Sequence, residues 1–155
     1  MNTVLTSLVA VFATLAGSTL TFAFQRHTAL QTERFTRNRQ FWTERVSTYS
    51  AFAAAMTDFR RSQNDRWHLE QRDPNSSKVA SARQESYQRR ADATAALYRV
   101  RLVSHDPSLD LLAQAALDVT TDIHTAHDEE DRTKRGEKAR IALDRFLSDA
   151  LPQVH

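Results

Sequence analysis

Hydrophobic and polar positions divide the chain into one continuous apolar stretch and a longer, helically patterned remainder. Residues 4–24, VLTSLVAVFATLAGSTLTFAF, contain no charged side chain. A helix needs roughly 20 apolar residues to cross a bilayer, and this stretch has that length. No basic residue precedes it and no good cleavage site follows it, so a cleaved signal peptide is disfavoured. The pattern predicts a transmembrane anchor in residues 1–24.

The remainder, residues 25–155, shows the three- and four-residue spacing of amphipathic helices. Pro residues and clusters of Asn, Ser and Asp interrupt this spacing and mark turns. We predict four helices at about residues 31–72, 78–103, 107–126 and 129–151, the first much the longest. Asp106 followed by Pro107 is a strong signal for the start of the third helix. We expect the far end of the first helix, including Trp67, to extend beyond its partners.

Each predicted helix carries a stripe of side chains that we expect to face the core. In the first helix the stripe is Phe35, Trp42, Val46, Tyr49, Phe52, Ala53, Met56, Phe59 and Trp67. In the second it is Ala80, Tyr87, Ala91, Thr94, Tyr98 and Leu102, with Leu97 alongside. In the third it is Leu109, Leu112, Ala113, Ala116, Thr120 and Ile123, and in the fourth Ala139, Leu143, Phe146, Leu147 and Ala150.

Composition supports an all-α fold. The chain has two Gly and three Pro, which argues against a sheet with many turns, and no Cys, which excludes a thiol nucleophile and disulfides. The predicted architecture is one N-terminal transmembrane helix followed by an antiparallel cytoplasmic helical bundle.

The flanks of the predicted anchor indicate its orientation. Arg26, Arg34, Arg37 and Arg39 follow the anchor, against one acid, Glu33, and no basic residue precedes it. Lys and Arg near a span stay on the cytoplasmic side. We therefore predict a single-pass protein of the cell membrane, in contact with lipid, with its N-terminus outside and its domain inside.

One side of the predicted anchor carries small residues. Ala10, Ala13, Gly17 and Thr21 lie on this side, and Ala13 and Gly17 form a small-xxx-small pair. Such a face favours self-association or docking to another membrane helix, although small residues are also common in spans. The partners we expect are another protein, a second copy of the chain, or both.

Charge is distributed unevenly. Residues 25–105 contain 15 basic and 8 acidic side chains, whereas residues 106–155 contain 6 basic and 11 acidic ones. A basic half can meet nucleic acid or anionic lipid. Because the basic residues are spread along helices, we favour internal packing of acidic beside basic helices and expect no direct contact with nucleic acid.

Few residues are arranged for chemistry. His124 and His127 are three residues apart, near Asp122 and Asp128, and are weak candidates for metal binding. Carboxylate-bridged bundles need Glu-x-x-His pairs, which are absent, and a His near a helix C-terminus also interacts with the helix dipole. We find no glycine-rich phosphate loop or nucleophile motif. The chain is not predicted to be an enzyme or to bind a cofactor or small-molecule substrate.

Several features together resemble the small actinobacterial KilB-like membrane proteins associated with plasmid spread. These features are the Ala13–Gly17 segment, Phe24-Gln25-Arg26, Arg60-Arg61 and an Ala- and Arg-rich helical body. The resemblance implies a membrane-associated helper of conjugative DNA transfer without catalytic residues. The leading hypothesis is therefore a non-enzymatic, membrane-anchored scaffold or interaction protein. The alternatives are a membrane-active pore or toxin assembled through the small-residue face, and a metal-binding helical bundle.

Overall fold

Four helices and the short turns between them make up the described part of the chain. The computed structural model describes residues 39–154, in which we find no strand. The first helix spans residues 39–72 of this part, and it is followed by α2 (Ser77–Val103), α3 (Pro107–Thr121) and α4 (Glu129–Ala150). Short 3-10 helices, η1 (Asp122–Thr125) and η2 (Leu151–Val154), follow α3 and α4. The predicted all-α fold is confirmed for these residues.

The predicted anchor, residues 1–24, lies outside the described residues, as does the start of the first helix. None of the helices in residues 39–154 has both the length and the apolar character needed to span a bilayer. Trp42–His155 form one compact unit, and the architecture below is that of this unit.

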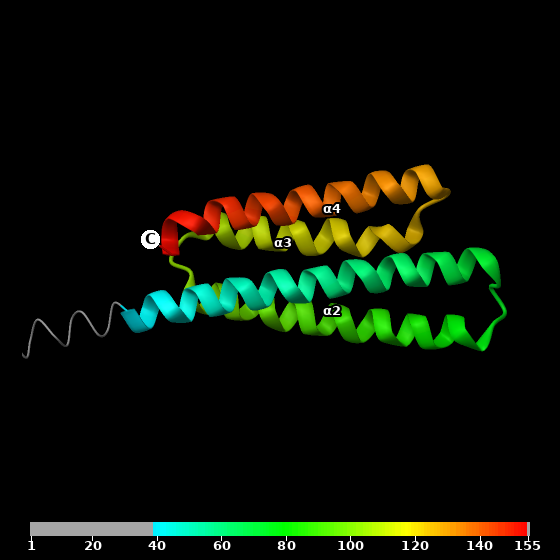
Figure 1. Ribbon diagram of the computed structural model, residues 1–155, viewed down its shortest axis with the longest axis horizontal. Helices are drawn as coiled ribbons and strands as arrows, with labels where there is room; N and C mark the ends of the chain where they lie inside the picture. The colour runs from blue at the N-terminus through cyan, green and yellow to red at the C-terminus, as the bar shows by residue number, and fades with distance from the viewer. Residues whose placement is uncertain (1–38, 155) are drawn as a thin grey trace, which may run out of the picture. The chain divides into compact units, whose positions relative to one another are not determined.

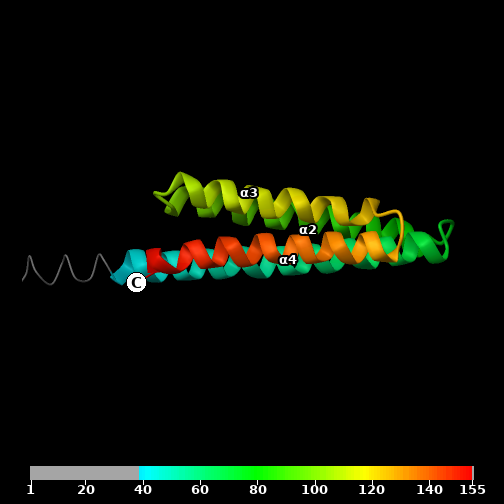
Figure 2. The same ribbon diagram turned by 90° about the horizontal axis from the view of Figure 1, so that it is seen from above.

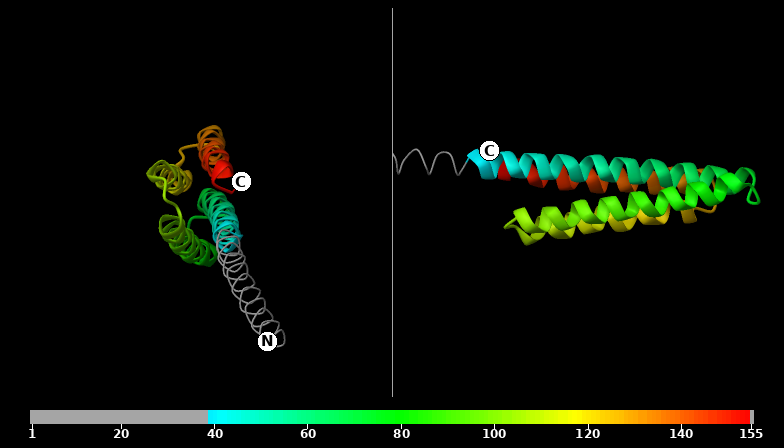
Figure 3. Two further views of the ribbon diagram at one scale, coloured as in Figure 1. Left: turned by 90° about the vertical axis from the view of Figure 1, so that its left-hand side faces the viewer. Right: turned by 90° about the horizontal axis from the view of Figure 1, so that it is seen from below.

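Successive helices of this unit run in opposite directions (Figures 1 and 2). Viewed end-on, α2 lies beside the first helix, α3 beside α2, and α4 between α3 and the first helix (Figure 3). This is the up-down-up-down order of a four-helix bundle with short loops. The C-terminal turn lies near the start of the unit, where Gln153 accepts a hydrogen bond of 2.9 Å from the Tyr49 hydroxyl.

Each of the three later helices has a polar N-cap residue. Its side chain accepts a hydrogen bond from a backbone N–H group that has no partner within the helix. Ser76 Oγ accepts from the N–H of Lys78 at the start of α2. Asp106 accepts from the N–H of Ser108 at 2.9 Å, with Pro107 as the first residue of α3, as predicted. Asp128 caps α4 through the N–H of Asp131 at 2.8 Å.

The core combines aromatic side chains from the first helix and α4 with aliphatic ones from α2 and α3. The ring of Phe146 in α4 meets the edges of Tyr49 and Phe52, with centroids 5.9 and 4.8 Å away. Half of the residues that α2 and α3 contribute to this cluster are alanines, which lets these helices approach closely. The cluster comprises Tyr49, Phe52, Met56, Phe59, Ala93, Ala96, Leu97, Val100, Leu109, Ala113, Ala116, Leu117, Phe146 and Ala150.

The predicted inward stripe of α2 was wrong. Tyr87 and Tyr98 are each 55% exposed and Leu102 is 83% exposed, and of that predicted set only Leu97 is buried. The residues that face the core are Val79, Ser86, Ala93, Ala96, Leu97 and Val100. The helix carries apolar residues on two opposite sides. The larger side chains are on the outward side, so the sequence pattern favoured that side as the buried one. Protein interiors are close-packed, and the space beside the core phenylalanines fits the smaller inward side chains of α2.

A buried glutamine links three of the helices beyond the apolar cluster. Gln63 donates from Nε2 to the backbone oxygen of Thr121 at 3.0 Å and accepts from the Ser86 hydroxyl at 3.0 Å. Buried polar groups need such partners, and every buried side-chain N or O atom in residues 39–154 has one. The network fixes the alignment of the first helix, α2 and α3.

The prediction that Trp67 extends beyond the partners of the first helix was wrong, although the last residues of this helix and the start of α2 do reach beyond the α3–α4 connection (Figure 1). Trp67 is only 6% exposed, because the segment between α3 and α4 folds over it. Its indole nitrogen donates to the backbone oxygen of Ala126 at 2.8 Å. The third helix was expected to reach about residue 126, but α3 ends at Thr121 and continues as η1, whose Ile123 is also buried.

Candidate interaction surfaces

The outward side of α2 carries five exposed apolar and aromatic side chains, which we call the α2 stripe: Ala80, Tyr87, Ala91, Tyr98 and Leu102. Their spacing of mostly four and seven residues places them on one face of the helix. Leu102 is the most exposed of the large hydrophobic residues described. Single surface apolar residues are usual, but several on one helix face make that face a candidate interaction site.

Arginine side chains lie over both aromatic rings of the α2 stripe. The guanidinium of Arg101 lies 5.5 Å from the centroid of Tyr98 and pairs with Asp110 of α3 at 2.5 Å. Arg66 of the first helix lies 5.8 Å from the centroid of Tyr87. Cation–π contacts of this kind restrict the rings without burying them. The stripe is therefore partly ordered before any partner arrives.

Glu70 holds two arginines near one end of the stripe. Its Oε1 accepts from Arg66 at 3.0 Å and from Arg83 of α2 at 3.1 Å. Burial would raise the pKa of Glu70, but the hydrogen bonds from Arg66 and Arg83 outweigh burial and lower that pKa. The carboxylate therefore stays ionised and joins the first helix to α2.

The helix that bears the stripe is strongly basic. α2 contains six basic and two acidic residues, and one of the basic side chains, Arg89, pairs with Glu85 at 3.6 Å. The exposed Arg90 and Arg99 have no ion pair with another described residue within 4.0 Å. A surface that is apolar along its centre and positive along its edges suits a partner with an apolar face and acidic edges.

The predicted metal candidates do not come together. His124 Nδ1 lies 2.8 Å from the backbone oxygen of Thr121, while the backbone N–H of His127 donates to Asp131 at 3.1 Å. Burial lowers the pKa of His124. Asp128 caps α4. Across residues 39–154, no three His, Asp or Glu side chains are grouped so that they could hold a metal ion.

The membrane-packing residues Ala10, Ala13, Gly17 and Thr21, on which the pore alternative depends, lie outside the described residues.

Arg132 of α4 has partners that the sequence did not predict. Asp128 lies four residues before Arg132, but its carboxylate is occupied at the helix cap. Arg132 instead pairs with Glu129, and its Nη1 donates to Oδ1 of Asn64 on the first helix at 2.6 Å. Its guanidinium also lies 5.6 Å from the centroid of the Trp67 ring.

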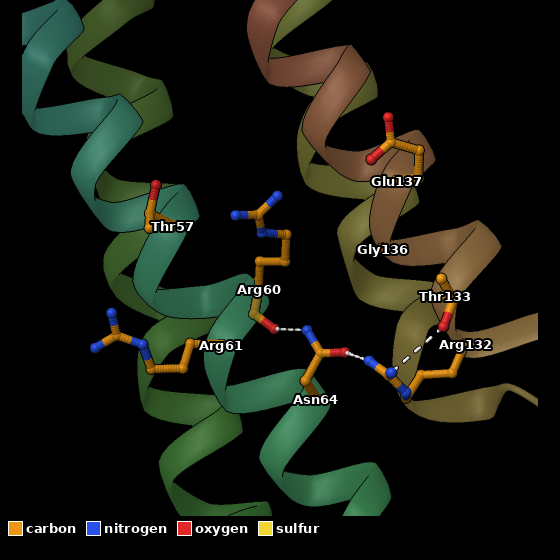
Figure 4. A pocket seen from close by; sticks show the side chains of 8 residues that line it. All are labelled: Thr57, Arg60, Arg61, Asn64, Arg132, Thr133, Gly136 and Glu137. Carbon is orange, nitrogen blue, oxygen red and sulfur yellow. Dashed lines mark hydrogen bonds between the residues drawn. The ribbon is translucent and has the colours of Figure 1, made fainter. Parts of the chain in front are cut away.

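An open groove between the first helix and α4 was missed in the sequence. It has a volume of about 420 Å³ and is lined by Thr57, Arg60, Arg61, Asn64, Arg132, Thr133, Gly136 and Glu137 (Figure 4). Arg60-Arg61 stood out in the sequence, but nothing in the pattern indicated that Gly136 and Arg132 of α4 would lie opposite them.

The bundle, its exposed apolar helix face and its polar groove are those of an all-α protein with surfaces suited to binding. A family model described as KilB plasmid transfer protein matches residues 46–154, which is nearly all of the described bundle. The chain belongs to this family, and the resemblance drawn from its sequence is confirmed. No curated protein and no solved structure gives a significant match to the chain.

Proposed function

We propose that this protein is a non-enzymatic helper of plasmid transfer that recruits another protein through the α2 stripe. The family match supplies the context of plasmid transfer. The observation that carries the binding role is the exposure of Tyr87, Tyr98 and Leu102 on one face of a helix whose core contacts are complete without them. The protein acts as a scaffold and needs no catalytic group.

The energetics of the stripe favour a partner. Covering a large apolar side chain contributes about 1.5–3 kcal/mol, and Leu102 is almost fully available for this. Tyrosine and arginine are enriched among the residues that dominate protein interfaces, and Tyr98 with Arg101 presents both. The partner we expect is an amphipathic helix with acidic residues beside its apolar face, because α2 is basic.

Membrane attachment is the second part of the proposal and rests on the sequence. The uncharged stretch of residues 4–24 is long enough to span a bilayer, and the arginines that follow it favour a cytoplasmic domain. The small-residue face with Ala13 and Gly17 provides a contact for another membrane helix or a second copy. In this arrangement the bundle presents the α2 stripe to partners at the inner surface of the cell membrane.

The test is a plasmid whose copy of this gene is deleted and replaced by variants of the full chain. Leu102→Glu places an acid within the stripe, and we expect a fall of tenfold or more in transfer frequency at unchanged protein level. Leu111→Glu is the matched control, since Leu111 is 70% exposed on α3 outside the stripe. Equal transfer with Leu102→Glu and the wild type, or equal loss with both variants, would contradict the proposal.

A photo-cross-linking residue at position 98 identifies the partner directly. Cross-linking to an acidic amphipathic helix of another protein is the expected result, and it should disappear with Leu102→Glu. Cross-linking to a second copy of this chain would contradict the proposed partner and show that the α2 stripe is a dimer interface.

A further inference from the structure

The groove between the first helix and α4 has more positive than negative charge among its lining residues. Arg60 extends into the space between the two helices, and Arg132 lies at the end near the α3–α4 connection (Figure 4). Arg61 lies on the same turn of the first helix as Arg60 and points away from α4. Glu137 is the single carboxylate among the eight lining residues.

Arg132 is held in place before any ligand binds. Its guanidinium donates to Asn64 Oδ1 at 2.6 Å, pairs with Glu129 and lies over the ring of Trp67. Asn64 is itself fixed, because its Nδ2 donates to the backbone oxygen of Arg60 at 2.8 Å. A guanidinium ordered in this way loses little conformational entropy when it binds an anion.

Arg60 provides the second cation. Its side chain has no ion pair or hydrogen bond with another described residue. The carboxylate of Glu137 is engaged by Arg140, which donates to its two oxygens at 2.6 and 3.0 Å. Arg60 therefore makes no ion pair within 4.0 Å in the described part of the chain, although its charge adds to the hydrogen bonds from Arg140 in lowering the pKa of Glu137.

Gly136 leaves the wall of α4 open beside these arginines. A Cβ atom built on Gly136 would meet no atom within 4 Å. Thr133 adds a hydroxyl one turn earlier on α4, and this hydroxyl donates to the backbone oxygen of Glu129 while Arg132 donates to it at 3.4 Å. The groove thus offers open space with guanidinium groups on both of its walls, while the hydroxyls of Thr57 and Thr133 already donate to backbone oxygens of their own helices.

We propose that this groove binds a phosphate group, either as free phosphate or as the phosphomonoester of a small molecule such as a nucleotide. The guanidinium of Arg60 supplies forked N–H donors that match the oxygens of a phosphate. Arg132, whose Nε and Nη2 are already paired with Glu129, adds its remaining Nη1 N–H. A volume of about 420 Å³ lies within the range of small-molecule sites, so the groove holds a phosphate with room for an attached group.

The experiment is a titration of the full chain in mild detergent, followed by the NMR signals of the arginine Nε–H groups. The ligands are inorganic phosphate, adenosine monophosphate, adenosine and acetate at constant ionic strength. We expect phosphate to shift the signals of Arg60 and Arg132 with a dissociation constant of about 1 mM or below. Stronger binding of the nucleotide than of phosphate would show that the ligand of the groove is a phosphomonoester. Equal binding of the two, with none of adenosine, would identify phosphate alone.

Four variants make the result specific. Arg60→Gln should weaken phosphate binding at least tenfold, whereas Arg99→Gln, which removes one exposed charge from α2, should leave it within twofold. Gly136→Glu should abolish binding by placing a carboxylate in the open space, and Gly136→Gln controls for size. Helical content measured by circular dichroism verifies that each variant is folded.

Absence of phosphate-induced shifts, equal binding of acetate, or equal weakening by Arg60→Gln and Arg99→Gln would each overturn the proposal.

Discussion

The indole nitrogen of Trp67 lies 2.8 Å from the backbone oxygen of Ala126 and donates a hydrogen bond to it. This contact joins the far end of the first helix to the segment that connects α3 with α4. The guanidinium of Arg132 lies over the same indole ring, so one side chain binds two later parts of the chain. Trp67 thereby closes one end of the bundle.

Replacing Trp67 by Phe should lower the free energy of unfolding by about 1–3 kcal/mol, because the buried oxygen of Ala126 loses its donor. Urea unfolding of the full chain, followed by circular dichroism, measures the change. Tyr98→Phe is the control, since its ring is more than half exposed and the substitution should change stability by less than about 0.5 kcal/mol. Similar values for the two variants would show that the Trp67 hydrogen bond does not stabilise the fold.

Gly136→Ala should stabilise the protein by about 0.5–1 kcal/mol. Gly136 lies within α4, where alanine restricts the unfolded chain, and its added Cβ has open space around it. Thermal unfolding should show a higher midpoint. The converse change, Ala95→Gly on the exposed side of α2, should lower the midpoint by a similar amount. A lower midpoint for Gly136→Ala would mean that the free space beside the helix is filled in solution.

Asp106 should make stability depend on acidity. Hydrogen bonds from the hydroxyl and then the backbone N–H of Ser108 lower the pKa of its carboxylate, with a further contribution from Gln153. Because the folded pKa lies below the unfolded one, this stabilisation is present above the ordinary aspartate pKa. It is lost as pH falls through the lower, folded value.

The measurement is the urea midpoint of the wild type and of Asp106→Asn at several pH values between about 6 and 2. Asparagine also caps helices but does not titrate, so its midpoint should fall less steeply in acid. Parallel curves for the two proteins would show that Asp106 contributes nothing to the pH dependence.

Local signals were sufficient to predict much of this fold. Asp106 and Pro107 define the start of α3 because capping and a fixed φ act within a few residues. The stripes of the first helix and α3 were largely correct because each has a single dominant apolar face, as the burial of Phe52, Phe59 and Leu109 shows.

The remaining features depend on which elements meet. α2 has apolar residues on opposite sides, so its periodicity could not decide between Tyr98 and Ala93 as the inward residue. Trp67 is buried by a segment that follows α3, and the groove forms only when Arg60 and Gly136 are brought together by the packing of the first helix against α4. Such long-range pairings cannot be predicted from the local pattern of hydrophobic and polar residues.

The two faces of α2 have no residue in common, and this separation has an evolutionary consequence. Substitutions of Tyr87, Tyr98 or Leu102 leave the contacts of Ala93, Ala96 and Val100 with the core intact. The partner preference proposed for the α2 stripe can therefore change by mutation of a few outward positions, while selection for a folded bundle acts on a different set of codons.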